Sequence, residues 1–162
     1  MAKTLVAYFS VLGETGITGR AAAAIAEAAG ADLFEIVPAQ AYTKADVDYT
    51  DPRSRSCREN DDESARPEVA SHVADMDGYD VVFVGCPIWW GVEPRIVDSF
   101  LDAHDFSDKV IVPFATSGGS GIGAYERHLQ KVCPAATFRQ GRLLNGRQTA
   151  DSVRPWVKSS LA

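Results

Sequence analysis

The first segment with residues suited to ligand chemistry is Ser10-Val11-Leu12-Gly13-Glu14-Thr15. It offers two hydroxyl groups, and its glycine lets the backbone turn tightly and approach a ligand closely. A helix that starts after such a loop presents unpaired N–H groups and its positive dipole end. This combination can hold a phosphomonoester without Lys or Arg. The same residues are equally compatible with a simple N-cap that binds no ligand.

Two motifs for other phosphate ligands are missing from this segment. No Gly-Lys-Ser/Thr follows it, so it is not a P-loop, and it does not match G-x-G-x-x-G. The segment therefore gives little support to a nucleoside triphosphate or a dinucleotide.

Two further segments are suited to binding a flat polar ring. Pro87-Ile88-Trp89-Trp90-Gly91 contains adjacent tryptophans, which cannot both point into one core easily, so we expect one at the surface. An exposed indole can stack on a heteroaromatic ring. The stretch from Thr116 to Gly123 has four glycines in eight positions, which expose backbone N–H and C=O groups to a ring edge. The alternative is a flexible connection, although a connection needs only a few residues.

Strands and helices alternate along the chain. Short apolar segments predict strands, and apolar residues at helical spacing predict helices. We expect strands at Thr4–Phe9, Asp32–Val37, Tyr79–Cys86 and Lys109–Ala115, with a broken last strand at Ala136–Phe138 and Arg142–Leu144. We expect helices at Thr15–Ala29, Pro67–Met76, Pro94–Ala103, Ala124–Val132 and Ala150–Leu161. Residues 39–66 show no sustained period and are interpreted as a long surface loop, either functional or merely solvated.

This alternation predicts an α/β fold: a three-layer α/β/α, doubly wound parallel sheet in a single domain over residues 1–162. In such sheets ligands bind beyond the carboxyl ends of the strands. The three segments described above follow the first, third and fourth predicted strands. They should therefore meet at one edge of the sheet.

Composition limits the function classes. The formal net charge of −6 argues against nucleic acid, and suits either a basic protein partner or solubility alone. No run approaches the ~20 apolar residues of a membrane span, and the apolar run near Met1 is too short for a signal peptide. Cys57, Cys86 and Cys133 form no C-x-x-C, so neither a disulfide framework nor a zinc site is predicted. We expect a cytoplasmic protein.

The three histidines, His72, His104 and His128, are dispersed and show no metal-ligand spacing. We expect them to be surface or capping residues. Cys86 is expected to be a small buried residue, and Asp61-Asp62-Glu63 a solvated acidic stretch.

Taken together, the chain resembles the flavodoxins, in particular a flavodoxin-like subgroup with a Pro-Ile-Trp-Trp-Gly loop. The resemblance extends over nearly the whole chain and is carried by YFSVLGETG, GADLFEIVPAQAY, YDVVFVGCPIWWG and VIVPFATSGGSG. It implies a five-stranded parallel sheet in the order 2-1-3-4-5, with flavin mononucleotide (FMN) bound at the junction of strands one and three.

The resemblance also implies roles for individual residues, none of them catalytic or metal-binding. The phosphate would be held by Ser10, Gly13, Glu14, Thr15, Gly16 and Thr18. The isoalloxazine would be lined by Pro87, Ile88, Trp89, Trp90 and Gly91, and its pyrimidine edge met by the loop from Thr116 to Gly123, including Ser117, Gly118 and Gly119.

Three positions depart from the family pattern. Flavodoxins often carry Thr where Leu12 stands and Asn where Glu14 stands. Glu14 would then contribute through its backbone N–H, with its carboxylate turned out. The third loop lacks the Tyr that often flanks the flavin, and Tyr42 from the long loop is the residue we expect to cover the ring.

The resemblance favours an electron-transfer protein that shuttles electrons between redox partners, such as a reductase or ferredoxin-type donor and an acceptor enzyme. An alternative is an NAD(P)H-dependent quinone or flavin oxidoreductase acting on a small quinone, although no separate nicotinamide-binding motif is present. A third possibility is a member that has lost the flavin. A receiver-type signalling domain is set aside, because the third strand ends in Gly85-Cys86 instead of acids.

Overall fold

The computed structural model describes residues 3–162 and contains one parallel sheet. Met1 and Ala2, which belong to the segment judged too short for a signal peptide, lie outside the described residues. The strands are β1 (Thr4–Tyr8), β2 (Asp32–Glu35), β3 (Val81–Pro87), β4 (Val110–Thr116), β5 (Thr137–Phe138) and β6 (Arg142–Leu143). The order is β2-β1-β3-β4-β5, and β6 also pairs with β4. The predicted order is confirmed, and β5 and β6 are the two parts of the predicted broken strand.

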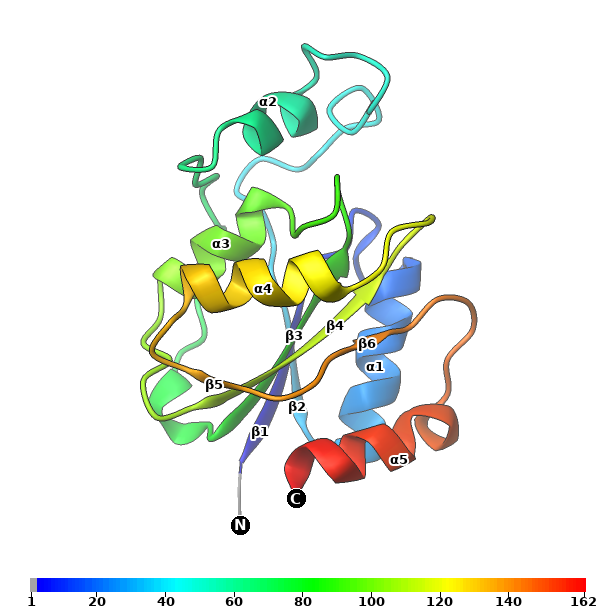
Figure 1. Ribbon diagram of the computed structural model, residues 1–162, viewed down its shortest axis with the longest axis vertical. Coiled ribbons are helices and arrows are strands. Elements are labelled where there is room, and N and C mark those ends of the chain that lie inside the picture. Colours follow the sequence, from blue (N-terminus) through cyan, green and yellow to red (C-terminus); the bar gives the residue numbers. More distant parts are fainter. Residues whose placement is uncertain (1–2) are drawn as a thin grey trace.

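Helices cover both faces of the sheet, as Figure 1 shows. They are α1 (Ile17–Ala29), α2 (Arg55–Asp61), α3 (Arg95–Asp102), α4 (Gly123–Val132) and α5 (Ala150–Leu161). Successive residues of a strand point to opposite faces. In β3, Val82 and Val84 therefore pack in the same core as α3 and α4, while Val81 and Phe83 pack in the core that contains α1 and α5. Burial on both faces explains why these strands have continuous apolar sequences.

The predicted helix over Pro67–Met76 is wrong. This segment contains no α-helix. Val69 forms an antiparallel bridge with Pro38, through hydrogen bonds from the Ala39 N–H to the Glu68 carbonyl and from the Ala70 N–H to the Val37 carbonyl. Only a 3-10 turn follows, η2 (Met76–Gly78). Local helix propensity here is overridden by pairing with a segment about thirty residues away in the sequence.

Residues 39–66, called the excursion below, contain one short helix that the sequence did not predict. Ser54 caps α2, its side chain accepting a hydrogen bond from the backbone N–H of Cys57. Figure 1 places α2 at one end of the molecule, opposite the chain's C-terminus. The excursion thus lies above the carboxyl edge of the sheet, where the three predicted ligand loops meet.

No helix among residues 3–162 is both long enough and apolar enough to cross a bilayer.

Candidate functional site

The first loop is a compact turn between β1 and α1. It contains a short 3-10 helix, η1 (Gly13–Thr15), and Gly13 adopts a positive φ of 62° that favours glycine. The Thr15 hydroxyl donates to the Leu12 carbonyl over 2.9 Å. The helix α1 starts after Gly16 without a side-chain cap. Ser10 is 8% exposed, and its hydroxyl is not one of the buried side-chain atoms that lack a partner among residues 3–162, whereas the N–H groups of the first turn of α1 have no side-chain cap. Unpartnered polar groups therefore collect at the start of α1.

Two glycines allow this loop to lie directly against the helix. A Cβ at Gly16 would be 2.4 Å from the Ser10 Oγ, and a Cβ at Gly19 would be 2.2 Å from the Gly13 carbonyl oxygen. Both distances are far too short for any side chain larger than hydrogen. The loop and the first turn of α1 thus form a backbone-lined cradle of the kind that binds anions at helix N-termini.

Acidic groups surround this cradle. The Glu35 carboxylate lies 3.3 Å from where a Cβ of Gly13 would stand, and Glu14 is exposed nearby. Burial, followed by the charge of Glu14, raises the pKa of Glu35. Burial and the charges of Glu35 and Glu14 raise the pKa of Tyr8 to about 12. An anion at this loop would depend on backbone N–H groups and hydroxyls for its binding, because the nearest charges repel it.

Thr18 has a contact that the sequence did not predict. Its hydroxyl lies 2.7 Å from the Thr116 hydroxyl, and both side chains are buried. This contact joins the first turn of α1 to the end of β4. It holds the first and third loops together.

The tryptophan turn, residues 89–92, is a tight two-residue turn. Trp89 and Val92 exchange backbone hydrogen bonds of 2.9 and 3.2 Å, while Trp90 and Gly91 have φ of 51° and 85°. Positive φ at both central residues is typical of a type I′ turn, which strongly prefers Asn and Gly. Trp90 is therefore in a strained conformation, of the kind that clusters at ligand sites.

The two indoles lie in different environments, as expected from their adjacency. Trp89 packs edge-on against Phe9 and Tyr42, with ring centroids 5.8 and 5.5 Å apart. Trp90 is 46% exposed. Tyr42 is buried against Trp89 and lines neither of the cavities described next. We expected it to cover a bound ring, but in the structure it packs in the core.

Two adjacent cavities open at this edge of the sheet. One of about 440 Å³ is lined by Val47, Tyr49, Ser56, Ile88, Trp89, Trp90, Ser117, Gly118, Gly119 and Ser120. The other, of about 310 Å³, is lined by Ile17, Pro87, Ile88, Trp89, Thr116, Ser117, Gly118, Asn145 and Gly146. The structure thus brings together the predicted second and third loops. Gly91, Gly123 and the predicted phosphate residues, Ser10 to Thr18, line neither cavity, although Ile17 beside them lines the smaller one.

Two lining regions were missed from the sequence. Asn145 accepts a hydrogen bond from the Ser117 N–H over 2.7 Å and so supports the third loop. Tyr49, in the excursion, is 76% exposed and lines the larger cavity. The only sequence signal for Asn145 was an isolated Asn-Gly pair after the last strand. No periodic pattern marked the segment that contains Tyr49.

A family model described as flavodoxin matches residues 3–160. The chain belongs to the flavodoxin family.

Solved structures support this flavodoxin assignment. A candidate flavoprotein from Bacteroides eggerthii DSM 20697 is 45% identical, with a TM-score of 0.93 over 100% of this chain and 99% of its own. A second, from Bacteroides uniformis ATCC 8492, is 44% identical, with a TM-score of 0.90 over 97% and 98%. A Lactobacillus acidophilus NCFM flavoprotein in complex with FMN shares the fold at 23% identity, with a TM-score of 0.72 over 90% and 95%. A search of curated proteins gives no match.

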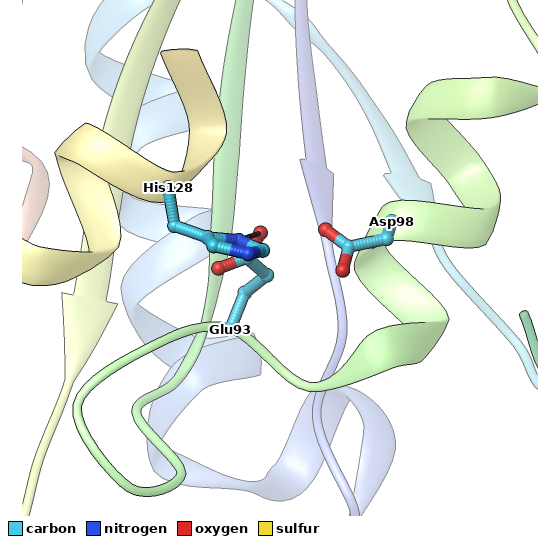
Figure 2. A group of neighbouring side chains, drawn as sticks. All are labelled: Glu93, Asp98 and His128. Atoms are coloured by element: carbon cyan, nitrogen blue, oxygen red, sulfur yellow. Dashed lines mark hydrogen bonds and ion pairs between the residues drawn. The ribbon is translucent and has the colours of Figure 1, made fainter. Parts of the chain in front are cut away.

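Behind the tryptophan turn, this flavodoxin buries a cluster of charged groups, drawn in Figure 2. Glu93 directly follows the turn, Asp98 lies on α3 and His128 lies on α4. Glu93 and Asp98 are 1% and 0% exposed. His128 Nδ1 is 2.7 Å from Glu93 Oε2, and its Nε2 is 3.0 Å from Glu63 Oε1. The expectation that His128 is a surface or capping residue is wrong. The same expectation is confirmed for the other two histidines. His72 is exposed, and His104 caps backbone groups of Val73 and Phe100 with its two ring nitrogens.

The buried carboxyl groups of Glu93 and Asp98 are close enough to share one proton. Glu93 Oε1 and Asp98 Oδ1 are buried and have no hydrogen-bond donor. Oxygens of the two side chains lie within 4.8 Å of each other, and two ionised carboxylates at that distance would repel each other. Burial, and then the proximity of Glu93 as a hydrogen-bond partner, raises the pKa of Asp98 to about 9, so its carboxyl group keeps its proton at neutral pH and can donate it to Glu93. The Arg95 guanidinium, 3.5 Å from the other Asp98 oxygen, supplies the compensating charge.

This cluster reaches the strand that carries the tryptophan turn. Cys86 is completely buried on β3, and burial, followed by the charge of Glu93, raises the pKa of its thiol. Tyr125 donates its hydroxyl proton to the Val84 carbonyl over 2.7 Å. The protonated thiol and the neutral phenol make this a structural environment. Cys57, Cys86 and Cys133 are all free and buried.

Proposed function

We propose that this chain binds FMN at the carboxyl edge of its sheet. The observation that carries the proposal is the pair of cavities that share Ile88, Trp89, Ser117 and Gly118 and that lie beside the uncapped start of α1. A planar ring fits between an aromatic turn and a backbone-rich loop, and a phosphate fits a helix N-terminus. The FMN complex of the Lactobacillus relative supports the choice of flavin.

The residues divide by chemical type. We assign the phosphate to the Ser10 hydroxyl and to the backbone N–H groups from Gly13 to Thr18, since side-chain charge there is negative. We assign the ring to Pro87–Gly91 and to Thr116–Gly119, with Ser117 held by Asn145. When bound, FMN supplies one- and two-electron redox chemistry, and the protein supplies binding, orientation and electrostatics.

We propose that the function is electron transfer between protein partners. Leu12, Ile17, Trp90 and Tyr49 form exposed apolar groups around the cavities, and the net charge of −6 suits a basic partner. The three free, buried cysteines fit a reducing compartment, so we place this activity in the cytoplasm.

One observation favours the second function, an NAD(P)H-dependent quinone or flavin oxidoreductase. The cavity of about 440 Å³ extends from the ring-lining loops to Val47, Tyr49 and Ser56 of the excursion, which lie outside the segments assigned to the ring. In this case the excursion would form the outer wall of a substrate site.

Two measurements test these functions in turn. Titration of the purified chain with FMN should give saturable binding and a perturbed flavin spectrum; an unchanged spectrum at excess protein would refute FMN binding. Steady-state assays of the loaded protein with NAD(P)H and benzoquinone then separate the functions. An electron carrier gives no sustained turnover until a partner reductase is added, and turnover without that reductase identifies the enzyme.

A further inference from the structure

His128 joins three segments that are distant in the sequence. It lies on α4, its Nδ1 contacts Glu93 directly after the tryptophan turn, and its Nε2 contacts Glu63 in the excursion. The excursion carries Val47, Tyr49 and Ser56, which line the larger cavity. The imidazole thus connects the turn that forms one wall of the cavity to the segment that forms another.

The two contacts require a charged imidazole. A carboxylate oxygen only accepts hydrogen bonds, so both ring nitrogens must donate, and only the imidazolium has two N–H groups. Glu93 Oε1 is buried without a hydrogen-bond partner, and the other oxygen, Oε2, is the one that contacts His128. The hydrogen bond to Glu93 raises the pKa of His128 although burial opposes it.

Loss of the proton breaks one contact, and burial decides which one. The Glu93 side chain is 0% exposed and has no water to replace His128, whereas that of Glu63 is 57% exposed. A buried acceptor that loses its donor costs more free energy than an exposed one. The neutral imidazole therefore keeps its N–H on Glu93 and releases the Glu63 carboxylate. That carboxylate keeps its exposed ion pair with Lys131, at 2.9 Å, and the Glu63 carbonyl still accepts from Arg66.

We propose that His128 is a proton-dependent clamp whose imidazolium holds the excursion to the tryptophan turn, and that loss of the proton releases the excursion at Glu63 and loosens the wall of the cavity. This inference depends on neither FMN nor a particular partner. The charged groups that face His128 are Glu93 directly after the turn, Arg95 and Asp98 from α3, Glu63 and Arg66 from the excursion, and Lys131 on α4 itself.

The release is local, because other contacts keep the excursion in place. Arg95 donates to the Glu59 and Asn60 carbonyls at the end of α2, and Arg66 pairs with Asp102 over 2.6 Å. A proton-dependent change should therefore be largest at residues 60–64 and smaller toward Tyr49.

A metal ion is the competing explanation for this cluster. Ligand atoms of Glu93, Asp98 and His128 lie within 4.8 Å of one another. However, the guanidinium groups of Arg95 and Arg66 already lie 3.5 and 3.9 Å from Asp98. A divalent cation would add to two positive charges in a buried site, whereas a shared proton satisfies the two carboxyl oxygens without adding that charge.

The test follows the full-length protein from about pH 6 to about pH 9 by two methods. Nitrogen NMR of the His128 ring should show both nitrogens protonated at the lower pH and one at the higher pH. Amide hydrogen exchange, corrected for its intrinsic pH dependence, should show roughly fivefold less protection of residues 60–64 at the higher pH, the size of a partly exposed ion pair. A neutral ring at about pH 6, or unchanged protection, would overturn the clamp.

Glu63→Gln is the matched variant. Its amide can accept from the imidazolium and can donate to the neutral imidazole, so the contact survives in both states. We expect protection at residues 60–64 to become independent of pH, while His72→Gln, a change of an exposed histidine, behaves like the unchanged chain. A pH-dependent loss in Glu63→Gln equal to that of the unchanged chain would refute the mechanism. Stoichiometric binding of Zn²⁺ with loss of protons from His128 would refute the clamp and show that the cluster is a metal site.

Discussion

The first loop and the tryptophan turn lie at the same edge of the sheet, but different interactions hold them. The first loop is held by its own backbone: Gly13, Gly16 and Gly19 lie within seven residues, and each allows a close approach. The tryptophan turn contains a strained residue, Trp90, and is held from behind by Glu93, which contacts α3 and α4. One site is therefore built locally and the other by buried charges from distant parts of the chain.

The largest expected effect concerns the pH dependence of the charges behind the turn. The folded-state pKa of Asp98 is about 9, above the value of about 4 in an unfolded chain. The contribution of such a group is fully present below the unfolded pKa and is lost as pH rises toward the folded one. Between about pH 5 and pH 8, the unchanged chain should lose up to about 1.4 kcal/mol of unfolding free energy per pH unit relative to Asp98→Asn. Urea unfolding of both proteins at several pH values measures this difference; parallel curves would contradict the shared proton.

The next prediction compares two variants of Asp98, one that loses the hydrogen-bond donor and one that keeps it. Asp98→Ala removes the donor to buried Glu93 and should lower the unfolding free energy by about 3 kcal/mol. Asp98→Asn keeps a donor of similar shape and should cost less than about 1 kcal/mol at neutral pH. Denaturant unfolding at a single pH gives both values. Equal losses in the two variants would show that the ion pair with Arg95, not the proton shared with Glu93, dominates.

A substitution in the first turn of α1, where the helix packs against the first loop, should cost somewhat less. Alanine normally stabilises a helix relative to glycine, by about 0.5–1 kcal/mol. At Gly19 the new Cβ would be 2.2 Å from a carbonyl oxygen, so Gly19→Ala should destabilise by about 2 kcal/mol. Gly121→Ala, where a Cβ would meet nothing within 4 Å, is the control and should change stability by less than about 0.5 kcal/mol. Stabilisation by Gly19→Ala would mean that the loop does not pack on the helix in this way.

The tryptophan turn should respond in the opposite direction. Trp90→Asn places a residue that tolerates positive φ in a type I′ turn and should raise the unfolding free energy by about 0.5–1 kcal/mol. The same change removes the exposed indole, so FMN binding should weaken. Thermal unfolding and an FMN titration measure the two effects. A loss of stability above about 1 kcal/mol would show that the packing of Trp90 outweighs its strain.

The smallest effect concerns the acids beside the first loop. Glu14→Gln removes one exposed negative charge near the proposed phosphate site and should strengthen FMN binding about two- to fivefold at low salt. It should also lower the pKa of Glu35, because the charge of Glu14 raises it. Binding titrations at low and high salt provide the check, since the gain should shrink as salt screens the charges. A gain that does not depend on salt would point to a local change in the loop backbone.

The same contrast explains what the sequence could predict. The parallel sheet, its ligand-binding edge and the three loops follow from apolar segments and glycines, which act through nearby residues, whereas the strand order came from the resemblance to the flavodoxins. The helix expected at Pro67–Met76 failed because Val69 pairs with Pro38, and no local pattern reports such a partner. The cluster of Glu93, Asp98 and His128 was missed because three ordinary polar residues become unusual only when the fold buries them together. Tyr49 was missed because the excursion has no periodicity.

The central claim is that the first loop holds the phosphate of a flavin whose ring lies against the tryptophan turn. Riboflavin has the same ring without the phosphate, so parallel titrations of the purified chain with FMN and riboflavin test this claim most directly. Several hydrogen bonds to a charged phosphate, each worth about 1.5–3 kcal/mol, should make FMN bind at least about 100-fold more tightly. Equal affinities for the two flavins, or no binding of either, would contradict the account.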